Sequence, residues 1–177
     1  MKFKTTEVLA RYVIDYFLNH TQIPEIKEND IDERLKNKAA CFVTVTIDGN
    51  LRGCIGNAVA NGPLYKSIIE NAVYAISRDY RFEPISLTEL PKLKVEVSVL
   101  SPLEEYHPAD RQELLNYLAR FKPGLMLSKS GRSALFLPQV WDQLPKPQEF
   151  LQQLCRKAGL PDNEWEGQLD FWTFQKI

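Results

Sequence analysis

The sequence has few of the residues that build metal centres or disulfide frameworks. It contains three cysteines, Cys41, Cys54 and Cys155, and two histidines, His20 and His107. None of them forms a C-x-x-C or H-x-x-x-H pattern, so a zinc site has no support. An odd number of widely spaced cysteines is typical of proteins in a reducing compartment. We therefore expect a cytoplasmic protein, and we predict no metal and no cofactor.

The chain also lacks a long apolar segment and an excess of charge of either sign. No run approaches the roughly 18 apolar residues that suggest a membrane helix, and the amphipathic start does not resemble a signal peptide. The 22 lysine and arginine residues nearly balance the 23 aspartate and glutamate residues along the chain. Binding to nucleic acid or to a membrane surface needs clustered positive charge, so neither partner is expected. Dinucleotide, Walker and nucleophile-elbow motifs are absent.

What is present is the composition of a globular protein, with 44% hydrophobic and 25% charged residues among 177. Apolar side chains at helical spacing predict helices from the Thr5-Thr6 caps through Phe17 and over 63–78, 108–121 and 148–158. Alternating apolar residues and turn signals predict strands over 41–47, 51–55, 93–99, 125–127, 134–137 and 169–174. Hairpins separated by helices, without regular alternation of strand and helix, indicate an α+β fold with a mostly antiparallel sheet flanked by helices.

The segment Asn50 to Asn57 is the most unusual in the chain. On a strand, Arg52 and Cys54 lie two residues apart and so share one face. Gly53 and Gly56 leave the backbone bare for the close approach of another group. A guanidinium beside a thiol favours the thiolate, so Cys54 is a candidate nucleophile or ligand-touching residue and Arg52 a candidate anion-binding residue. The alternative is a buried cysteine in a hairpin, with glycines that serve only the turn and packing; residue types alone favour it.

A second cluster follows the helix predicted over 63–78. Arg78 and Arg81 flank Asp79 and an aromatic residue, and two guanidiniums offer planar sets of donors to a carboxylate or phosphate. The alternative is a loop held by an ion pair between Asp79 and either arginine. His107 is predicted to lie in a loop, where it is a base for Cys54 only if the fold brings the two together.

The hexapeptide Leu51-Arg52-Gly53-Cys54-Ile55-Gly56 resembles the hallmark of the AMMECR domain family. Further segments resemble blocks of that family in the expected order across nearly the whole chain: 40–45, 63–65, 70–72, 78–82, 90–91, 95–102, 135–141 and 154–160. Two positions depart from the family pattern. Asn57 stands where the family more often has threonine, and Tyr80 replaces a residue that is frequently small or proline.

The resemblance implies a single domain over 1–177 with two unequal lobes, the larger built from both chain ends. It also implies a cytoplasmic protein, often encoded beside radical-SAM and Memo-like proteins, and it supplies no reaction. The candidate ligand-binding residues are Arg52, Gly53, Gly56, Asn57, Arg78, Asp79 and Arg81, with Cys54 as the candidate catalytic residue.

Three functions remain open at this point. In the first, the chain is a binding or accessory component that acts with radical-SAM and Memo-like proteins in a modification pathway, with a ligand groove around Arg52, Gly53 and Cys54. Alternatively, it is an enzyme that uses Cys54 as nucleophile or redox ligand on a small anionic substrate. The third function is an RNA-binding regulator, which the near-neutral charge disfavours.

Overall fold

The computed structural model describes residues 3–177, and contacts divide the chain into two compact units, 1–100 and 101–177. Each unit combines helices with one antiparallel sheet, which confirms the α+β class. Each unit is also continuous in sequence. The larger unit is therefore not built from both chain ends, and this corrects an expectation that came from the family resemblance.

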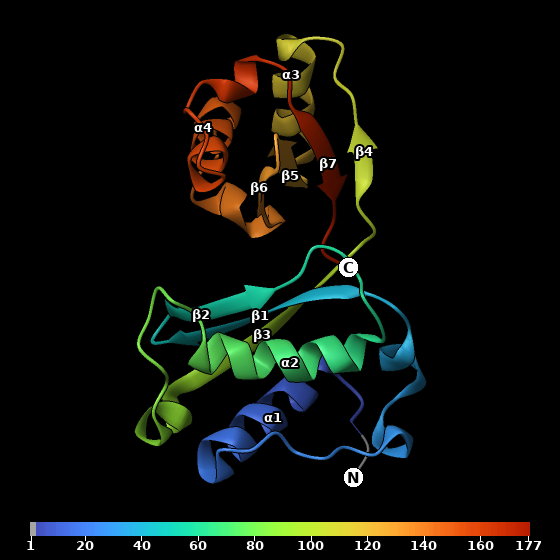
Figure 1. Ribbon diagram of the computed structural model, residues 1–177, viewed down its shortest axis with the longest axis vertical. Coiled ribbons are helices and arrows are strands. Elements are labelled where there is room, and N and C mark those ends of the chain that lie inside the picture. The colour runs from blue at the N-terminus through green and yellow to red at the C-terminus, as the bar shows by residue number, and fades with distance from the viewer. Residues whose placement is uncertain (1–2) are drawn as a thin grey trace. The chain divides into compact units, whose positions relative to one another are not determined.

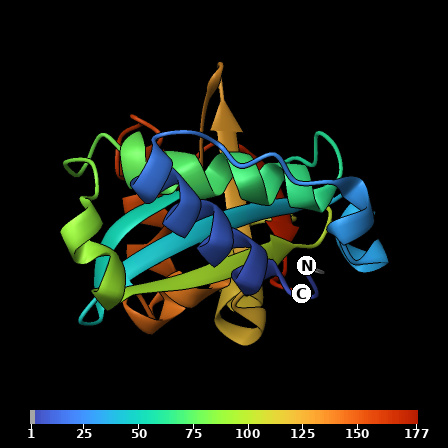
Figure 2. The same ribbon diagram turned by 90° about the horizontal axis from the view of Figure 1, so that it is seen from below.

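The first unit is a three-stranded antiparallel sheet, in the order β2-β1-β3, with two helices on one face (Figures 1 and 2). Its elements in chain order are α1 (Thr6–His20), the 3-10 helices Glu28–Asp30 and Glu33–Lys36, β1 (Ala40–Ile47), β2 (Asn50–Gly56), α2 (Leu64–Ser77), the 3-10 helix Leu87–Lys92 and β3 (Leu93–Leu100). Alternate side chains of β1, among them Val43 and Val45, are buried against helix residues such as Val13 and Ile68. Each such side chain, when fully buried, contributes roughly 1.5–3 kcal/mol.

The turn between β1 and β2 fixes the position of the hexapeptide. Asp48 and Gly49 both have positive φ, 52° and 82°, the condition for the tight hairpin turn that the sequence predicts. The resulting register pairs Thr44 with Cys54. Cys54 lies on the face opposite to α2, while a Cβ at Gly53 would face this helix. The register then shifts, because Gly53 pairs with Val45 but Leu51 pairs with Thr46, so Arg52 is the extra residue at an irregularity of β2.

The second unit has a four-stranded antiparallel sheet in the order β4-β7-β5-β6. Its elements in chain order are β4 (Glu104–Tyr106), α3 (Arg111–Phe121), β5 (Gly124–Lys129), β6 (Arg132–Phe136), the 3-10 helix Pro138–Asp142, α4 (Pro147–Lys157), the 3-10 helix Glu164–Glu166 and β7 (Asp170–Phe174). Trp141 stacks on Phe150, with ring centroids 3.8 Å apart, and donates a hydrogen bond to the Pro123 carbonyl. These contacts place Trp141 inside a core that is separate from that of the first unit.

Residues 3–177 lack two further features. No helix there is long and apolar enough to span a membrane. In the same residues, no group of three or more histidine, cysteine, aspartate or glutamate side chains is arranged to hold a metal ion.

Candidate functional site at the β2 edge

Gly53 lies where β2 crosses the backbone of α2. A Cβ at this position would be 2.0 Å from the Ala75 carbonyl oxygen and 3.1 Å from a methyl group of Val45. Real Cβ atoms do not approach backbone oxygens so closely, so any side chain would force β2 and α2 apart. The bare backbone at Gly53 is therefore covered by the protein's own helix. This glycine serves packing, as the alternative interpretation of the sequence predicted, and does not receive a ligand there.

Gly56 and Asn57 also face groups of the first unit. A Cβ on Gly56 would be 2.4 Å from both the Cys41 carbonyl oxygen and the Phe42 ring. The Asn57 side chain accepts a hydrogen bond from Asn71 Nδ2 at 3.2 Å, and its own Nδ2 donates to the Val59 carbonyl. Asn71 Nδ2 also donates to the Cys41 carbonyl at 3.1 Å. The end of β2 is thus tied to α2 through the buried Asn71.

The main chain of Cys54 is held by two side chains from the loop after α2. Its N–H donates to Asp79 Oδ2 at 2.9 Å, and its carbonyl accepts from Arg81 Nη2 at 3.3 Å. Since β2 is the last strand on its side of the sheet, these groups point away from β1 and would otherwise be unpaired. Asp79 and Arg81 therefore take the place of a neighbouring strand.

Asp79 and Arg81 also bind each other through two parallel bonds. Arg81 Nη2 donates to Asp79 Oδ2 at 2.6 Å and Arg81 Nε donates to Asp79 Oδ1 at 2.9 Å. The Asp79 side chain is only 3% exposed. The guanidinium of Arg81, together with the Cys54 N–H, lowers the pKa of Asp79 to about 2, and the carboxylate in turn raises the pKa of Arg81. This ion pair is the one expected if the loop is held together by Asp79 and an arginine, rather than if both arginines bind an external anion.

Arg52 points to a carboxylate of its own rather than to open solvent. Its Nε donates to Glu89 Oε1 at 2.8 Å, its Nη2 donates to Glu89 Oε2 at 3.3 Å, and its Nη1 donates to the Glu83 carbonyl at 2.7 Å. Glu89 also accepts from the Ser86 N–H, and that bond and Arg52 lower the pKa of Glu89. The guanidinium is thus neutralised by the fold and does not lie ready for an external anion.

The Cys54 thiol is half-buried, in contrast to the other two cysteines. Thr44 Oγ1 donates a hydrogen bond to Cys54 Sγ at 3.2 Å across the β1–β2 ladder. Cys41 and Cys155 are fully buried, and burial raises the pKa of Cys41 to about 11. Cys54 is therefore the cysteine that a reagent from solution reaches.

Three further residues from the sequence analysis, Arg78, Tyr80 and His107, lie outside the hydrogen bonds described above. The Arg78 guanidinium lies 4.5 Å from the centroid of the Tyr74 ring. Tyr80, between the two anchored residues Asp79 and Arg81, is 95% exposed. His107 belongs to the second unit, where its Nε2 lies 3.4 Å from Glu105.

Sequence reasoning missed the partners that hold the site residues, above all Glu89 and Asn71. Ser86 and Glu89 form a capping box, whose S-x-x-E pattern is readable in the sequence. That pattern predicts a fixed Glu89 but not its contact with Arg52, which lies 37 residues earlier. Asn71 is recognisable only as a polar residue within the apolar stripe of α2.

Comparison with known proteins places this geometry in a family. The sequence model of the AMMECR1 family matches residues 8–177. The chain is 36% identical to a protein of Thermoplasma acidophilum over 96% of this chain and 78% of that protein. It is 38% identical to one of Thermococcus kodakarensis, over 89% of this chain and 78% of that protein.

A solved structure supports the same assignment. The crystal structure of an uncharacterized protein from Pyrococcus horikoshii superposes with a TM-score of 0.84 at 32% identity, covering 96% of this chain and 86% of that one. The family match over nearly the full length and the shared fold agree. The chain therefore belongs to the AMMECR1 family.

Proposed function

We propose that this chain is a noncatalytic binding module that docks onto a protein partner through the surface of the 78–84 loop, beside β2. One observation carries the proposal: Tyr80 is 95% exposed between two residues that are fastened to Cys54. An exposed large aromatic side chain on an anchored loop loses little conformational entropy on binding. Aromatic residues of this kind are enriched among the residues that dominate protein interfaces.

The charges at the site favour a protein partner over a small anion. Arg52 is engaged by Glu89, and Arg81 is engaged by Asp79. A small anionic ligand would have to displace a carboxylate from one of these pairs. An RNA backbone meets the same obstacle, and the net charge of −1 adds no attraction for phosphates. We propose the radical-SAM and Memo-like proteins as the partners, with a modification pathway as the setting.

The experiment is co-purification of the full chain with a Memo-like protein and with a radical-SAM protein from the same organism. The variant Tyr80→Ala should reduce the recovered complex at least tenfold, because interface aromatics of this type contribute about 2 kcal/mol or more. Phe121→Ala is the matched control, since Phe121 is an aromatic residue of the other unit that is 53% exposed. Failure of both partners to bind, or equal recovery with Tyr80→Ala, would contradict the proposal.

A second candidate function is catalysis by Cys54, which its half-buried thiol favours. A nucleophilic cysteine reacts faster than an ordinary thiol near neutral pH, because more of it is thiolate. The test is the alkylation rate of native protein, resolved by cysteine with mass spectrometry. Cys41 and Cys155, both fully buried, are internal controls. The binding proposal predicts a Cys54 rate no higher than that of a free thiol, and a much higher rate favours the enzyme.

A further inference from the structure

The second unit contains a hollow that no part of the proposed function uses. Its volume is about 660 Å³, within the range of small-molecule sites. It forms where the ends of β4 and β5 meet the start of β7, since its wall includes Tyr106 at the end of β4 and the following His107, Ser128 and Lys129 from β5, and Asp170 from β7. All of its lining residues lie within 106–171, in one unit.

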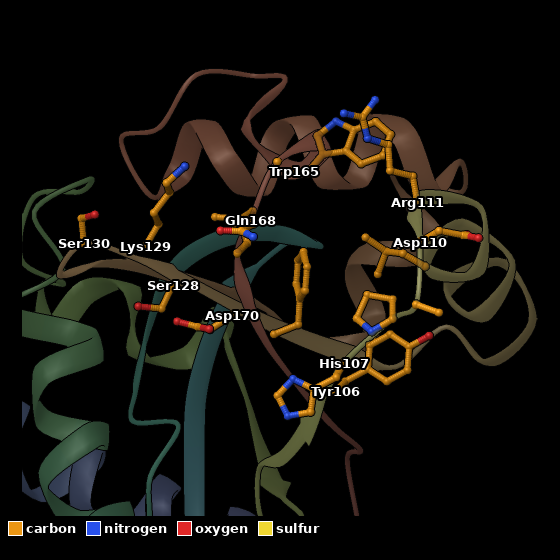
Figure 3. A pocket seen from close by; sticks show the side chains of 16 residues that line it. Tyr106, His107, Asp110, Arg111, Ser128, Lys129, Ser130, Trp165, Gln168 and Asp170 are labelled. Carbon is orange, nitrogen blue, oxygen red and sulfur yellow. The ribbon is translucent and has the colours of Figure 1, made fainter.

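Six side chains with polar atoms in this wall have no hydrogen bond or ion pair with other residues of 3–177: Tyr106, Ser128, Ser130, Trp165, Gln168 and Asp170. Ser128 and Asp170 are paired across β5 and β7, so their side chains lie next to each other on one face of the sheet. Figure 3 shows Ser128 and Asp170 close together, with Gln168 above them, Trp165 at the upper right and Tyr106 and His107 below. Hydrogen-bonding groups and aromatic rings thus line the same hollow.

The other charged groups of the wall are already engaged. Lys129 pairs with Glu164, and Arg111 binds Glu166 through a side-chain contact of 3.1 Å and a bond to its carbonyl. Asp110 accepts a hydrogen bond from the Glu113 N–H at the start of α3. A phosphate would therefore compete with glutamates for both cations, and Asp170 is left as the carboxylate with free acceptor oxygens.

We propose that this hollow binds a neutral molecule with two adjacent hydroxyl groups, a sugar or the ribose of a nucleoside. Both hydroxyls donate to Asp170, because an ionised carboxylate only accepts and has two oxygens to offer. Ser128, Ser130 and Gln168 supply further donors and acceptors. Tyr117 covers one face of the Tyr106 ring, so the other face of Tyr106 and the ring of His107 offer flat surfaces to the C–H groups of a sugar or to a base. This site is independent of the surface around Tyr80.

The test is a titration of the full chain with candidate ligands. Binding is measured by the changes in the backbone amide NMR shifts of residues 128–130 and 167–171. The probes are D-ribose, adenosine, 2′-deoxyadenosine, inorganic phosphate and spermidine. We expect adenosine to bind and 2′-deoxyadenosine to bind about tenfold more weakly, since hydrogen bonds to a charged group carry about that much affinity. Binding of ribose as well identifies a sugar site, and binding of adenosine without ribose identifies a nucleoside site.

Two variants and a control locate the binding. Asp170→Asn removes the charge at nearly constant size and should weaken adenosine binding about tenfold. Ser128→Leu fills the hollow and should abolish binding. Asp142→Asn changes an exposed aspartate outside the hollow and should leave the affinity unchanged. The proposal is overturned if neither ribose nor adenosine binds, if phosphate or spermidine binds more tightly, if the 2′-hydroxyl makes no difference, or if either variant binds like the unaltered chain.

Discussion

At Gly53, the lack of a side chain is what allows β2 to cross α2. The space that a Cβ would occupy holds the Ala75 carbonyl oxygen, a backbone atom that cannot rotate away. The adjacent Cys54 is held by its main chain rather than by its thiol, through Asp79 and Arg81. The most distinctive residues of the hexapeptide thus have structural tasks that are visible atom by atom.

The first prediction concerns this crossing. Gly53→Ala should destabilise the protein by about 3 kcal/mol or more, because overpacking here displaces backbone rather than a flexible side chain. Gly62→Ala is the control: nothing lies within 4 Å of a Cβ built at Gly62, and its φ is not positive. Urea unfolding curves should show a change of no more than about 0.5 kcal/mol for the control. Equal stability of the two variants would show that β2 and α2 do not meet at Gly53.

The second prediction concerns pH and Asp79. Its pKa is about 2 in the folded protein, below the usual 3.8. A lowered carboxylate pKa stabilises the fold at pH values above the unfolded pKa, and this contribution is lost as the pH falls from about 4 towards 2. The shift corresponds to about 2 kcal/mol.

Unfolding of the unaltered chain and of Asp79→Asn should be compared between about pH 6 and pH 2. The variant should be less stable near neutral pH, and the gap should narrow in acid, because the unaltered chain alone loses the Asp79 contribution there. A gap that stays constant with pH would contradict the assigned ion pair.

Residue types in the sequence predicted neither the irregularity of β2 at Arg52 nor what occupies the space around it. The two-residue alternation predicted a shared face for Arg52 and Cys54, but the register shifts between Gly53 and Leu51 and leaves Arg52 without a partner in the ladder. It did not predict that Glu89 would bind the Arg52 guanidinium or that α2 would cover Gly53. Both contacts join segments more than 20 residues apart, and no local pattern encodes them.

At the scale of elements, the loop 78–84 closes the outer edge of β2. An open edge strand offers unpaired N–H and C=O groups to other chains, and proteins commonly cover such edges. Here Asp79 and Arg81 bond to Cys54, and the Glu83 carbonyl accepts from Arg52. The loop is therefore fastened at three points, two of which flank Tyr80.

The third prediction tests this fastening. Arg52→Met keeps most of the apolar stem but removes the bonds to Glu89 and Glu83. It should cost about 1–3 kcal/mol, as expected for charge-assisted hydrogen bonds at a partly buried site. Amide hydrogen exchange should accelerate over residues 83–89.

The control for this variant is Arg34→Met, because Arg34 pairs with Asp32 at an exposed position. Surface pairs of that kind contribute little to stability, so Arg34→Met should destabilise the protein less than Arg52→Met does. Unchanged exchange over 83–89 in Arg52→Met would mean that Arg52 does not hold the loop.

Elements with strong local signals were predicted well, and short ones were not. The hairpin turn at Asp48-Gly49 and the helices α1, α2 and α4 follow from turn chemistry and apolar spacing. The strand β4 was missed because it has three residues, of which Glu104 and Glu105 are exposed. Its pairing with β7, some 67 residues later, makes it a strand.

At the scale of the whole molecule, the two proposed binding surfaces belong to different units. The surface around Tyr80 lies in residues 1–100 and the hollow lies in 101–177, and each unit has its own core. The sequence offered no sign of the hollow, because its wall draws on segments near 106, 128 and 168 that only the second sheet brings together. Substitutions in one surface should leave binding at the other unchanged, since the two sets share no residue.

The most direct test of the binding-module proposal is amide hydrogen exchange of the full chain, with and without a Memo-like or radical-SAM partner. The proposal predicts slower exchange in the complex, concentrated in residues 78–84 and the adjacent β2. It also predicts that Tyr80→Ala removes this protection at equal partner concentration. Protection confined to other parts of the chain, or no protection with either partner, would contradict the proposal.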